Sequence, residues 1–311
     1  MKIKPYSKIF VAGGRGMVGS ALIRKLKMLG FKNIVSPSSA ELDLTNQKRV
    51  IEFFRSEKFD FVFLAAAKVG GINANNTQKA DFIYQNIMIQ TNVIHSSYLS
   101  GVKKLVFLGS SCIYPKMSPQ PIKEEYLMTG ELEPTNDAYA IAKISGIKMC
   151  QSYNEQYGTD FISVMPTNLY GPNDNYDSKT SHVLPALIRK VHEAKISASD
   201  MITVWGSGNP RREFLYVDDL ADAILHVFEN HSGNDIINIG TGVDISIKEL
   251  VSIIQQIIGY ECEVIYDSNM PDGTPRKLLD VSKLNQLGWS YKTDISDGIR
   301  SAYEDFLNRE T

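Results

Sequence analysis

Short apolar runs alternate with longer amphipathic stretches through the first half of the chain. The short runs are typical of buried strands, and apolar residues spaced three or four apart are typical of helices packed on a core. The pattern predicts strands at residues 8–12, 33–36, 59–67, 104–109 and 160–166, with helices at 17–29, 47–56, 80–99 and 137–157. Strands that alternate with helices pair in parallel through right-handed crossovers. We therefore expect an α/β fold with a doubly wound, Rossmann-type parallel sheet.

The pattern changes after Pro166. Residues 168–179 are rich in Gly, Asn, Asp and Tyr, which predicts a long irregular loop, and a helix at 182–194 and an apolar segment at 202–205 follow. Residues 214–217 and 219–229 are predicted to be one more strand and helix that return to the sheet. A smaller lobe is expected to contain residues 236–239, 247–258 and 263–266.

This organisation predicts two interleaved units with a cleft between them. Residues 1–171 plus 213–240 are expected to form a dinucleotide-binding domain. Residues 172–212 plus 241–311 are expected to form a mainly substrate-binding α/β lobe, with approximate boundaries.

Charge and composition exclude several classes of protein. A formal net charge of −2 argues against a general nucleic-acid binder, since no basic excess is present to neutralise phosphates. The longest apolar run, residues 61–67, is far too short to span a membrane. The N-terminus has no signal-peptide pattern, and the three cysteines form no CxxC or Cys/His cluster that would indicate a metal. We expect a soluble, cytoplasmic protein in a reducing setting.

A glycine-rich segment lies between the first predicted strand and helix, with Gly13, Gly14, Arg15, Gly16, Met17, Val18 and Gly19 in order. Glycine there permits a tight turn and lets the backbone approach a pyrophosphate, which the helix N-terminus stabilises. The alternative is an ordinary tight connection. Because the segment follows a strand and opens a helix, it predicts a dinucleotide site.

The choice between the two nicotinamide cofactors depends on residues after the second strand, where an acid binds the ribose 2′-OH and a cation accommodates a 2′-phosphate. Residues 36–40 contain neither an acid nor a base. Arg15 is the nearby cation that could reach a 2′-phosphate, unless it is a solvated loop residue. We expect NADP(H) in preference to NAD(H). Asp43 and Leu44 are expected to line the adenine pocket, although Asp43 could equally cap the next helix.

Acid–base chemistry is predicted from two further segments. Tyr139 and Lys143 lie four residues apart in a predicted helix, so they share one face. Ser110 and Cys112 lie in a segment predicted to be the end of a strand, where alternate residues point to the same side. A phenol beside a cation can donate a proton, and a thiol can exchange one. The alternative for Cys112 is a small buried hydrophobic residue.

Together, Tyr139-x-x-x-Lys143, the serine at 110 and the glycine segment resemble the extended short-chain dehydrogenase/reductase superfamily. Residues 65–72, 109–115, 165–172, 181–187 and 271–280 narrow the resemblance to the GDP-L-fucose synthase family, from residue 10 to about residue 290. One departure is that the family often has arginine in the loop after the second strand, which this chain lacks between residues 36 and 40.

The resemblance implies conversion of GDP-4-keto-6-deoxy-D-mannose to GDP-L-fucose by epimerisation at C3 and C5 and NADPH-dependent reduction at C4. Tyr139 and Ser110 would hydrogen-bond the C4 oxygen. Lys143 would lower the pKa of the phenol and hold the nicotinamide ribose. Cys112 would be the base and His182 the acid, with His182 also beside the cofactor. The alternative for His182 is a polar residue that opens a helix after two good capping residues.

Five residues are candidates for binding the substrate, with Asn168 expected at the sugar or the diphosphate: Asn168, Lys190, Trp205, Arg212 and Lys277. Arg212 is the preferred diphosphate ligand because it follows a Gly/Asn/Pro turn, whereas Lys190 and Lys277 could be ordinary surface charges. The resemblance also implies a homodimer in which the helices at 80–99 and 137–157 pair. Alternatives for the whole chain are another nucleotide-sugar epimerase, dehydratase or reductase, and a cofactor-binding sensor without catalysis.

Overall fold

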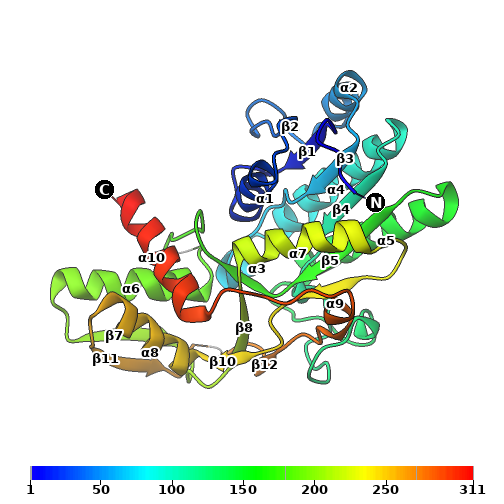
Figure 1. Ribbon diagram of the computed structural model, residues 1–311. Coiled ribbons are helices and arrows are strands. Elements are labelled where there is room, and N and C mark those ends of the chain that lie inside the picture. Colours follow the sequence, from blue (N-terminus) through cyan, green and yellow to red (C-terminus); the bar gives the residue numbers. More distant parts are fainter. Residues whose placement is uncertain (1, 179, 271, 311) are drawn as a thin grey trace.

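A computed structural model describes residues 2–178, 180–270 and 272–310 of the chain. Its centre is a six-stranded sheet in the order β2-β1-β3-β4-β5-β9, in which every neighbouring pair is parallel (Figure 1). The strands are β1 (Ile9–Ala12), β2 (Ile34–Val35), β3 (Phe61–Leu64), β4 (Lys104–Leu108), β5 (Phe161–Pro166) and β9 (Ile237–Ile239). The chain leaves β1 toward β2 on one side and reaches β3 on the other, which creates a switch point at the carboxyl end of β1. The predicted fold class is confirmed.

Helices cover both faces of this sheet. One face packs against α1 (Met17–Met28) and α7 (Val217–Asn230), and the other against α2 (Gln47–Glu57), α4 (Lys79–Leu99) and α5 (Asp137–Tyr157). Strand alternation divides β1 between the two cores, since Ile9 and Val11 join the first and Phe10 and Ala12 the second. Strands buried on both sides explain why the sequence shows continuous apolar runs.

A smaller lobe has a core of its own, to the lower left in Figure 1. One sheet contains β6 (Asn168–Tyr170), β8 (Arg211–Tyr216), β10 (Asp244–Ser246) and β12 (Arg276–Lys277), and another pairs β7 (Met201–Trp205) with β11 (Glu263–Asp267). The helices α6 (Val183–Ser197), α8 (Ile247–Ile258) and α10 (Ile295–Glu310) pack around this core. The short elements are α3 (Ile72–Thr77), α9 (Ser282–Gln286) and the 3₁₀ turns η1 (Ser111–Ile113) and η2 (Glu124–Tyr126).

Two predicted strands join different sheets from those expected. Residues 214–217 do not return to the central sheet, because β8 pairs with β6, β10 and β12. Residues 236–239 do not belong to the smaller lobe, because β9 pairs with β5. Short apolar runs of this kind carry no information on which sheet they join, so the sequence pattern could predict the strands but not their partners.

Asn173 connects three distant parts of the chain. Its side-chain amide donates to the carbonyl oxygen of Arg15 in the glycine-rich loop at 2.7 Å. Its amide oxygen accepts from Arg309 at 2.7 Å, and its backbone N–H donates to Asp305 at 2.8 Å, both on α10. Asn173 has a φ of +73°, a conformation that asparagine tolerates better than most residues. The C-terminal helix is therefore tied to the glycine-rich loop through one side chain.

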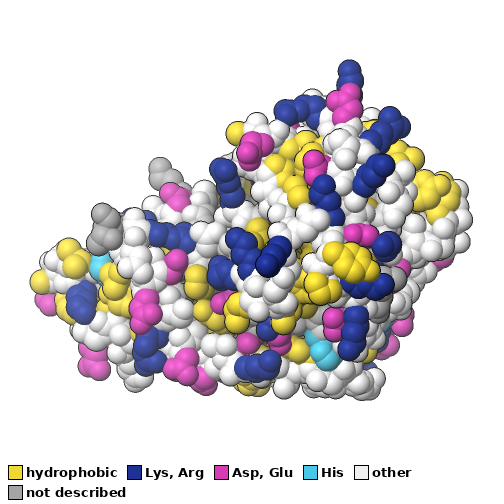
Figure 2. All heavy atoms as spheres, turned by 45° about the horizontal axis from the view of Figure 1, so that its top comes forward, with side chains coloured by type: hydrophobic (Ala, Val, Ile, Leu, Met, Phe, Trp, Pro, Cys, Tyr) yellow, Lys and Arg dark blue, Asp and Glu magenta, His cyan; other side chains and the backbone are white. Residues whose placement is uncertain are grey.

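The surface has charges of both signs. Figure 2 shows acidic and basic side chains interspersed over the face that it draws, without a broad patch of one sign. In the described part of the chain, no helix is both long and apolar enough to cross a membrane, and no group of His, Cys, Asp and Glu side chains is arranged to hold a metal ion.

Candidate active site

The glycine-rich loop joins the carboxyl end of β1 to the first turn of α1. Gly13 has a φ of +86°, and the Gly16 N–H donates to the Gly13 carbonyl oxygen at 3.0 Å. Gly19 packs so closely that a Cβ there would lie 2.2 Å from the same oxygen. Among the described residues no side chain caps α1, and its first turn, which begins with Met17 and Val18, has no acid. This helix terminus fits the pyrophosphate of a dinucleotide.

The region beyond β2 carries a cation and an anion. The Arg15 guanidinium is exposed and lies 4.0 Å from the carboxylate of Glu41. Glu41 accepts hydrogen bonds from the Ser38 hydroxyl and N–H, both at 2.7 Å, and these bonds lower the pKa of the carboxyl. Ser36 lies against the loop, since a Cβ on Gly14 would be 2.1 Å from its hydroxyl. The sequence analysis missed Glu41, which directly follows residues 36–40.

Asp43 and Leu44 follow the same segment. Asp43 accepts hydrogen bonds from the hydroxyl and N–H of Thr45, at 2.7 and 2.9 Å, while the N-cap of α2 is Asn46. The alternative in which Asp43 caps that helix is therefore wrong. Leu44 packs on the second core, and its carbonyl oxygen accepts from Asn92 at 2.9 Å. Their contact with adenine stays a prediction.

Ser110 and Cys112 lie just beyond β4 and not on it. The strand ends at Leu108, and Ser110 is the N-cap of the following 3₁₀ turn, so the predicted strand end is wrong. The Cys112 N–H donates to the Ser110 hydroxyl at 3.2 Å. A local bond of this kind competes with strand pairing. The turn nevertheless keeps the hydroxyl and the thiol close together, as the site requires.

Tyr139 and Lys143 lie one turn apart on α5. The Lys143 Nζ is buried, donates to the carbonyl oxygen of Leu108 at 2.8 Å, and lies 5.8 Å from the centre of the Tyr139 ring. Phe82 packs edge-on against that ring, with centroids 6.4 Å apart. The lysine therefore ties the helix to the end of β4, immediately before Ser110.

The electrostatics of this pair differ from the expectation that Lys143 lowers the pKa of the phenol. Burial raises the pKa of Tyr139, and the nearby Cys112 raises it further when charged, against a smaller effect of Ser110. Burial also lowers the pKa of Lys143 to about 7. Desolvation is the largest effect on the pKa of both groups. Tyr139 therefore stays protonated near neutral pH and can donate a hydrogen bond.

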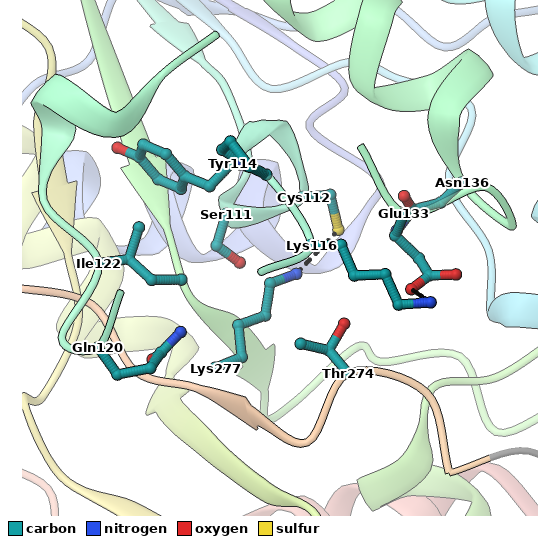
Figure 3. A pocket seen from close by; sticks show the side chains of 11 residues that line it. Ser111, Cys112, Tyr114, Lys116, Gln120, Ile122, Glu133, Asn136, Thr274 and Lys277 are labelled. Carbon is teal, nitrogen blue, oxygen red and sulfur yellow. Dashed lines mark hydrogen bonds and ion pairs between the residues drawn. The ribbon is translucent and has the colours of Figure 1, made fainter. Parts of the chain in front are cut away.

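Two cations approach Cys112 from the smaller lobe. The Lys277 Nζ lies 3.4 Å from the Cys112 Sγ, as the dashed line in Figure 3 shows, and Arg212 is opposite Lys277 where β8 pairs with β12. Burial by itself would raise the pKa of the thiol, but Lys277, Ser110 and Arg212 outweigh it and hold that pKa below its ordinary value. The cavity beside the thiol is also lined by Ser111, Tyr114, Pro115, Lys116, Gln120, Ile122, Glu133, Asn136 and Thr274.

His182 is the N-cap residue of α6, yet its side chain makes no capping hydrogen bond. Loss of solvation around the ring and the charge of Lys277 both lower the pKa of the imidazole. The segment before it is held by Gly71, whose N–H donates to the Thr180 carbonyl oxygen at 2.9 Å. The charge of Lys277 therefore influences both the proposed acid and the proposed base.

The remaining substrate candidates differ in their contacts and in their exposure. The Asn168 side chain donates to the Glu213 carbonyl oxygen at 2.8 Å, and Lys190 donates to that of Thr203 at 2.7 Å. Trp205 is 55% exposed at the end of β7, which leaves its ring open to a ligand. Burial lowers the pKa of Arg212, which donates to the neighbouring Arg211 carbonyl oxygen at 2.8 Å. Their contacts with substrate stay predictions.

Sequence reasoning missed the residues that fix Lys277. Glu213 is completely buried, and it accepts from the backbone N–H groups of Thr241, Gly242 and Leu279 at 2.6, 2.8 and 2.9 Å. A carboxylate between Arg212 and the apolar run 214–216 was the available signal, because a buried charge requires partners.

The sequence has close relatives among known proteins. Residues 9–240 match the model of the NAD dependent epimerase/dehydratase family. GDP-L-fucose synthase 1 from Arabidopsis thaliana is 58% identical over 301 residues, 97% of this chain and 93% of that protein. GDP-L-fucose synthase from Escherichia coli (strain K12) is 53% identical over 312 residues, 97% of each chain. The structure of a GDP-L-fucose synthetase from Naegleria fowleri bound to NADP has a TM-score of 0.93 at 30% identity, covering 100% of this chain and 96% of that one.

These similarities cover the central sheet, the smaller lobe and the loop that fits a dinucleotide, so the likeness includes the whole architecture around the site. A nicotinamide cofactor is the group that this architecture accommodates. By sequence and by fold, the chain belongs to the NAD dependent epimerase/dehydratase family.

Proposed function

We propose that this protein is a GDP-L-fucose synthase, which converts GDP-4-keto-6-deoxy-D-mannose to GDP-L-fucose. The observation that carries the proposal is the convergence of Ser110, Cys112 and Tyr139 where β4 meets α5, with Lys277 against the thiol. A reductase needs the serine and tyrosine, whereas an enzyme that also inverts two carbons needs a base and an acid besides them.

Epimerisation begins when the Cys112 thiolate takes the proton next to the C4 ketone. The electron pair of the broken C–H bond moves to the C4 oxygen, where Tyr139 and Ser110 donate hydrogen bonds to the resulting enolate. His182 then delivers a proton to the opposite face of the same carbon. The raised pKa of Tyr139 suits this role, because the phenol must remain a donor while negative charge develops beside it.

The nicotinamide cofactor, when bound, supplies the hydride that reduces C4. Tyr139 gives its proton to the C4 oxygen at this step, and Lys143 holds the ribose beside the phenol. We propose NADP(H) as the cofactor, with Arg15 as the cation toward the 2′-phosphate. The Arg15–Glu41 pair in this region gives the alternative, NAD(H), a physical basis, since an acid suits an unmodified ribose.

The nucleotide end of the substrate is proposed to bind on the smaller lobe. Arg212 is the preferred ligand of the diphosphate, and Lys277, opposite it on the neighbouring strand, is the second candidate. Asn168, Lys190 and Trp205 are proposed to complete the contacts. Residues 1–171 plus 213–240 would hold the cofactor, and 172–212 plus 241–311 mainly the substrate.

The purified protein should oxidise NADPH only when GDP-4-keto-6-deoxy-D-mannose is present. The rate is measured by loss of NADPH absorbance, with NADH in a parallel reaction and a UDP-sugar as the substrate control. Chromatography should identify GDP-L-fucose as the product. No cofactor oxidation with this substrate would overturn the proposed function, and equal rates with NADH would overturn the proposed cofactor preference.

Cys112→Ser separates the two halves of the reaction. We expect at least a hundredfold slower deuterium incorporation at C3 and C5 from D₂O, because a hydroxyl is a far weaker base than a thiolate. NADPH affinity should be unchanged, since the thiol lies outside the glycine-rich loop. Wild-type exchange rates in this variant would remove Cys112 from the mechanism.

A further inference from the structure

Lys277 differs from the charged residues around it in what it contacts. Its Nζ lies 3.4 Å from the Cys112 Sγ, and within the described part of the chain no carboxylate pairs with it. The preceding residue, Arg276, instead forms an ion pair with Asp244 on β10. Lys116 lines the same cavity, but it pairs with Glu133 at 2.9 Å (Figure 3). Lys277 is thus an ammonium directed at a thiol.

The backbone that directly follows Lys277 is fixed. The Leu278 N–H donates to the Gln120 side chain at 2.9 Å, and the Leu278 carbonyl oxygen accepts from Ile122 at 2.7 Å. The Leu279 N–H donates to Glu213, also at 2.9 Å. These bonds hold β12 against the segment that follows Cys112. The contact between ammonium and thiol is therefore built into the fold and does not depend on a flexible surface loop.

We propose that Lys277 keeps Cys112 in the thiolate form and so makes it the base of the epimerisation. This inference rests on the proposed function for its substrate. In the step itself, the thiolate sulfur gains the proton from carbon, and the C–H electron pair moves to the ketone oxygen. Lys277 keeps all its protons, and it acts only through the charge that it places beside sulfur. It is a positioning residue, distinct from the groups that touch the reacting carbon.

The other groups facing the thiol are consistent with this arrangement. Ser110 and Arg212 act in the same direction as Lys277, while burial opposes them. Tyr139 stays neutral beside the sulfur, so it adds no competing anion. Desolvation and the same ammonium lower the pKa of His182, so the protonated ring gives up its proton more readily. The positive charges near Cys112 therefore stabilise its thiolate, while the neighbouring Tyr139 phenol stays neutral.

The sequence analysis gave Lys277 as a candidate for binding the substrate diphosphate, with an ordinary surface charge as the alternative. Binding a diphosphate and stabilising a thiolate have different signatures. A diphosphate ligand affects substrate affinity, so its loss raises KM and leaves the free thiol unchanged. A thiolate partner affects Cys112 even when no substrate is present. Alkylation of Cys112 by iodoacetamide measures that difference directly, because only the thiolate reacts.

The experiment follows the alkylation rate from pH 5 to pH 10 for wild type and for Lys277→Met, which keeps the apolar stem and removes the charge. We expect the midpoint to move to higher pH and the rate at pH 7 to fall about tenfold. Lys277→Arg should restore most of the rate. Lys116→Met is the matched control from the same cavity and should alkylate like wild type. Cys112→Ser gives the background from Cys150 and Cys262.

An unchanged alkylation profile in Lys277→Met overturns the proposal, and so does an equal loss in Lys116→Met. If Lys277→Met fails to fold, as judged by its circular dichroism, Lys277→Gln replaces it. Deuterium exchange at C3 and C5 should show the same shift toward high pH in kcat. Because alkylation needs no sugar nucleotide, an inactive wild type would overturn the proposed function while leaving this test intact.

Discussion

Asp174 is an acidic side chain that the fold buries without satisfying it completely. One carboxylate oxygen accepts from the Asn175 N–H at 2.7 Å, and the other has no partner among the described residues. Burial raises the pKa of Asp174 to about 7, although this hydrogen bond and Arg309 act in the opposite direction. A carboxyl that holds its proton more tightly when folded stabilises the protein at low pH, and this stabilisation is lost as the pH rises through about 7.

The stability of the Asp174→Asn variant relative to wild type should therefore increase as the pH rises. The free energy of unfolding of the variant, relative to wild type, should increase by about 2 kcal/mol between pH 5 and pH 8, because only wild type must ionise a buried group. Urea unfolding of both proteins at the two pH values measures the change. If variant and wild type differ in free energy of unfolding by the same amount at pH 5 and pH 8, the burial cost does not belong to Asp174.

Gly71 lets the segment before α6 approach closely, because glycine has no side chain. It lies in the connection between β3 and α3, and its φ of −65° is available to any residue. The constraint is steric, since a Cβ there would lie 2.6 Å from the carbonyl oxygen of Ser181. That oxygen belongs to the residue before His182, so the connection after β3 determines where α6 begins.

Gly71→Ala should displace the start of α6 and slow the step that uses His182. We expect kcat for deuterium exchange at C3 and C5 to fall between tenfold and a hundredfold, because catalysis is sensitive to shifts of about 1 Å. Titration with NADPH measures cofactor affinity separately, because His182 is also expected to lie beside the cofactor. A variant with normal exchange would show that Gly71 does not act through His182.

The sequence predicts the helices and strands of the central sheet well. Continuous apolar runs such as Phe61–Leu64 leave little alternative to a buried parallel strand. It predicts the site less well. The two residues of β12 have no periodicity, and their partners on β8 lie sixty-five positions earlier in the chain. The contact between Lys277 and Cys112 depends on this pairing, so it could only emerge from the fold.

The whole molecule has an unpaired apolar face where α4 and α5 pack side by side. Tyr84 is 63% exposed on α4, and Met88 and Thr91, at helical spacing from it, are partly exposed. On α5, Ile141 is 46% exposed. Exposed apolar side chains on neighbouring helices are typical of interfaces. We propose that a second copy of the chain covers this face and forms the homodimer expected from the sequence.

Met88→Arg should weaken this dimer at least tenfold, because the interface would have to bury an unpaired charge. Met28→Arg is the matched control, since Met28 is 81% exposed at the end of α1. Sedimentation equilibrium should give wild type and the control a mass twice the 34.8 kDa of one chain, and Met88→Arg a concentration-dependent average below it. A monomeric wild type would contradict the dimer.

The bridge through Asn173 has a consequence for communication across the molecule. The Asn173 side chain bonds both the glycine-rich loop and Arg309, and its backbone N–H bonds Asp305, so we expect the loop and α10 to be coupled in local unfolding. Cofactor binding should therefore slow amide hydrogen exchange in α10, although that helix packs on the smaller lobe. By reciprocity, loosening α10 would weaken cofactor affinity by the same free energy. Amide hydrogen exchange in α10 should therefore report whether the glycine-rich loop is ordered.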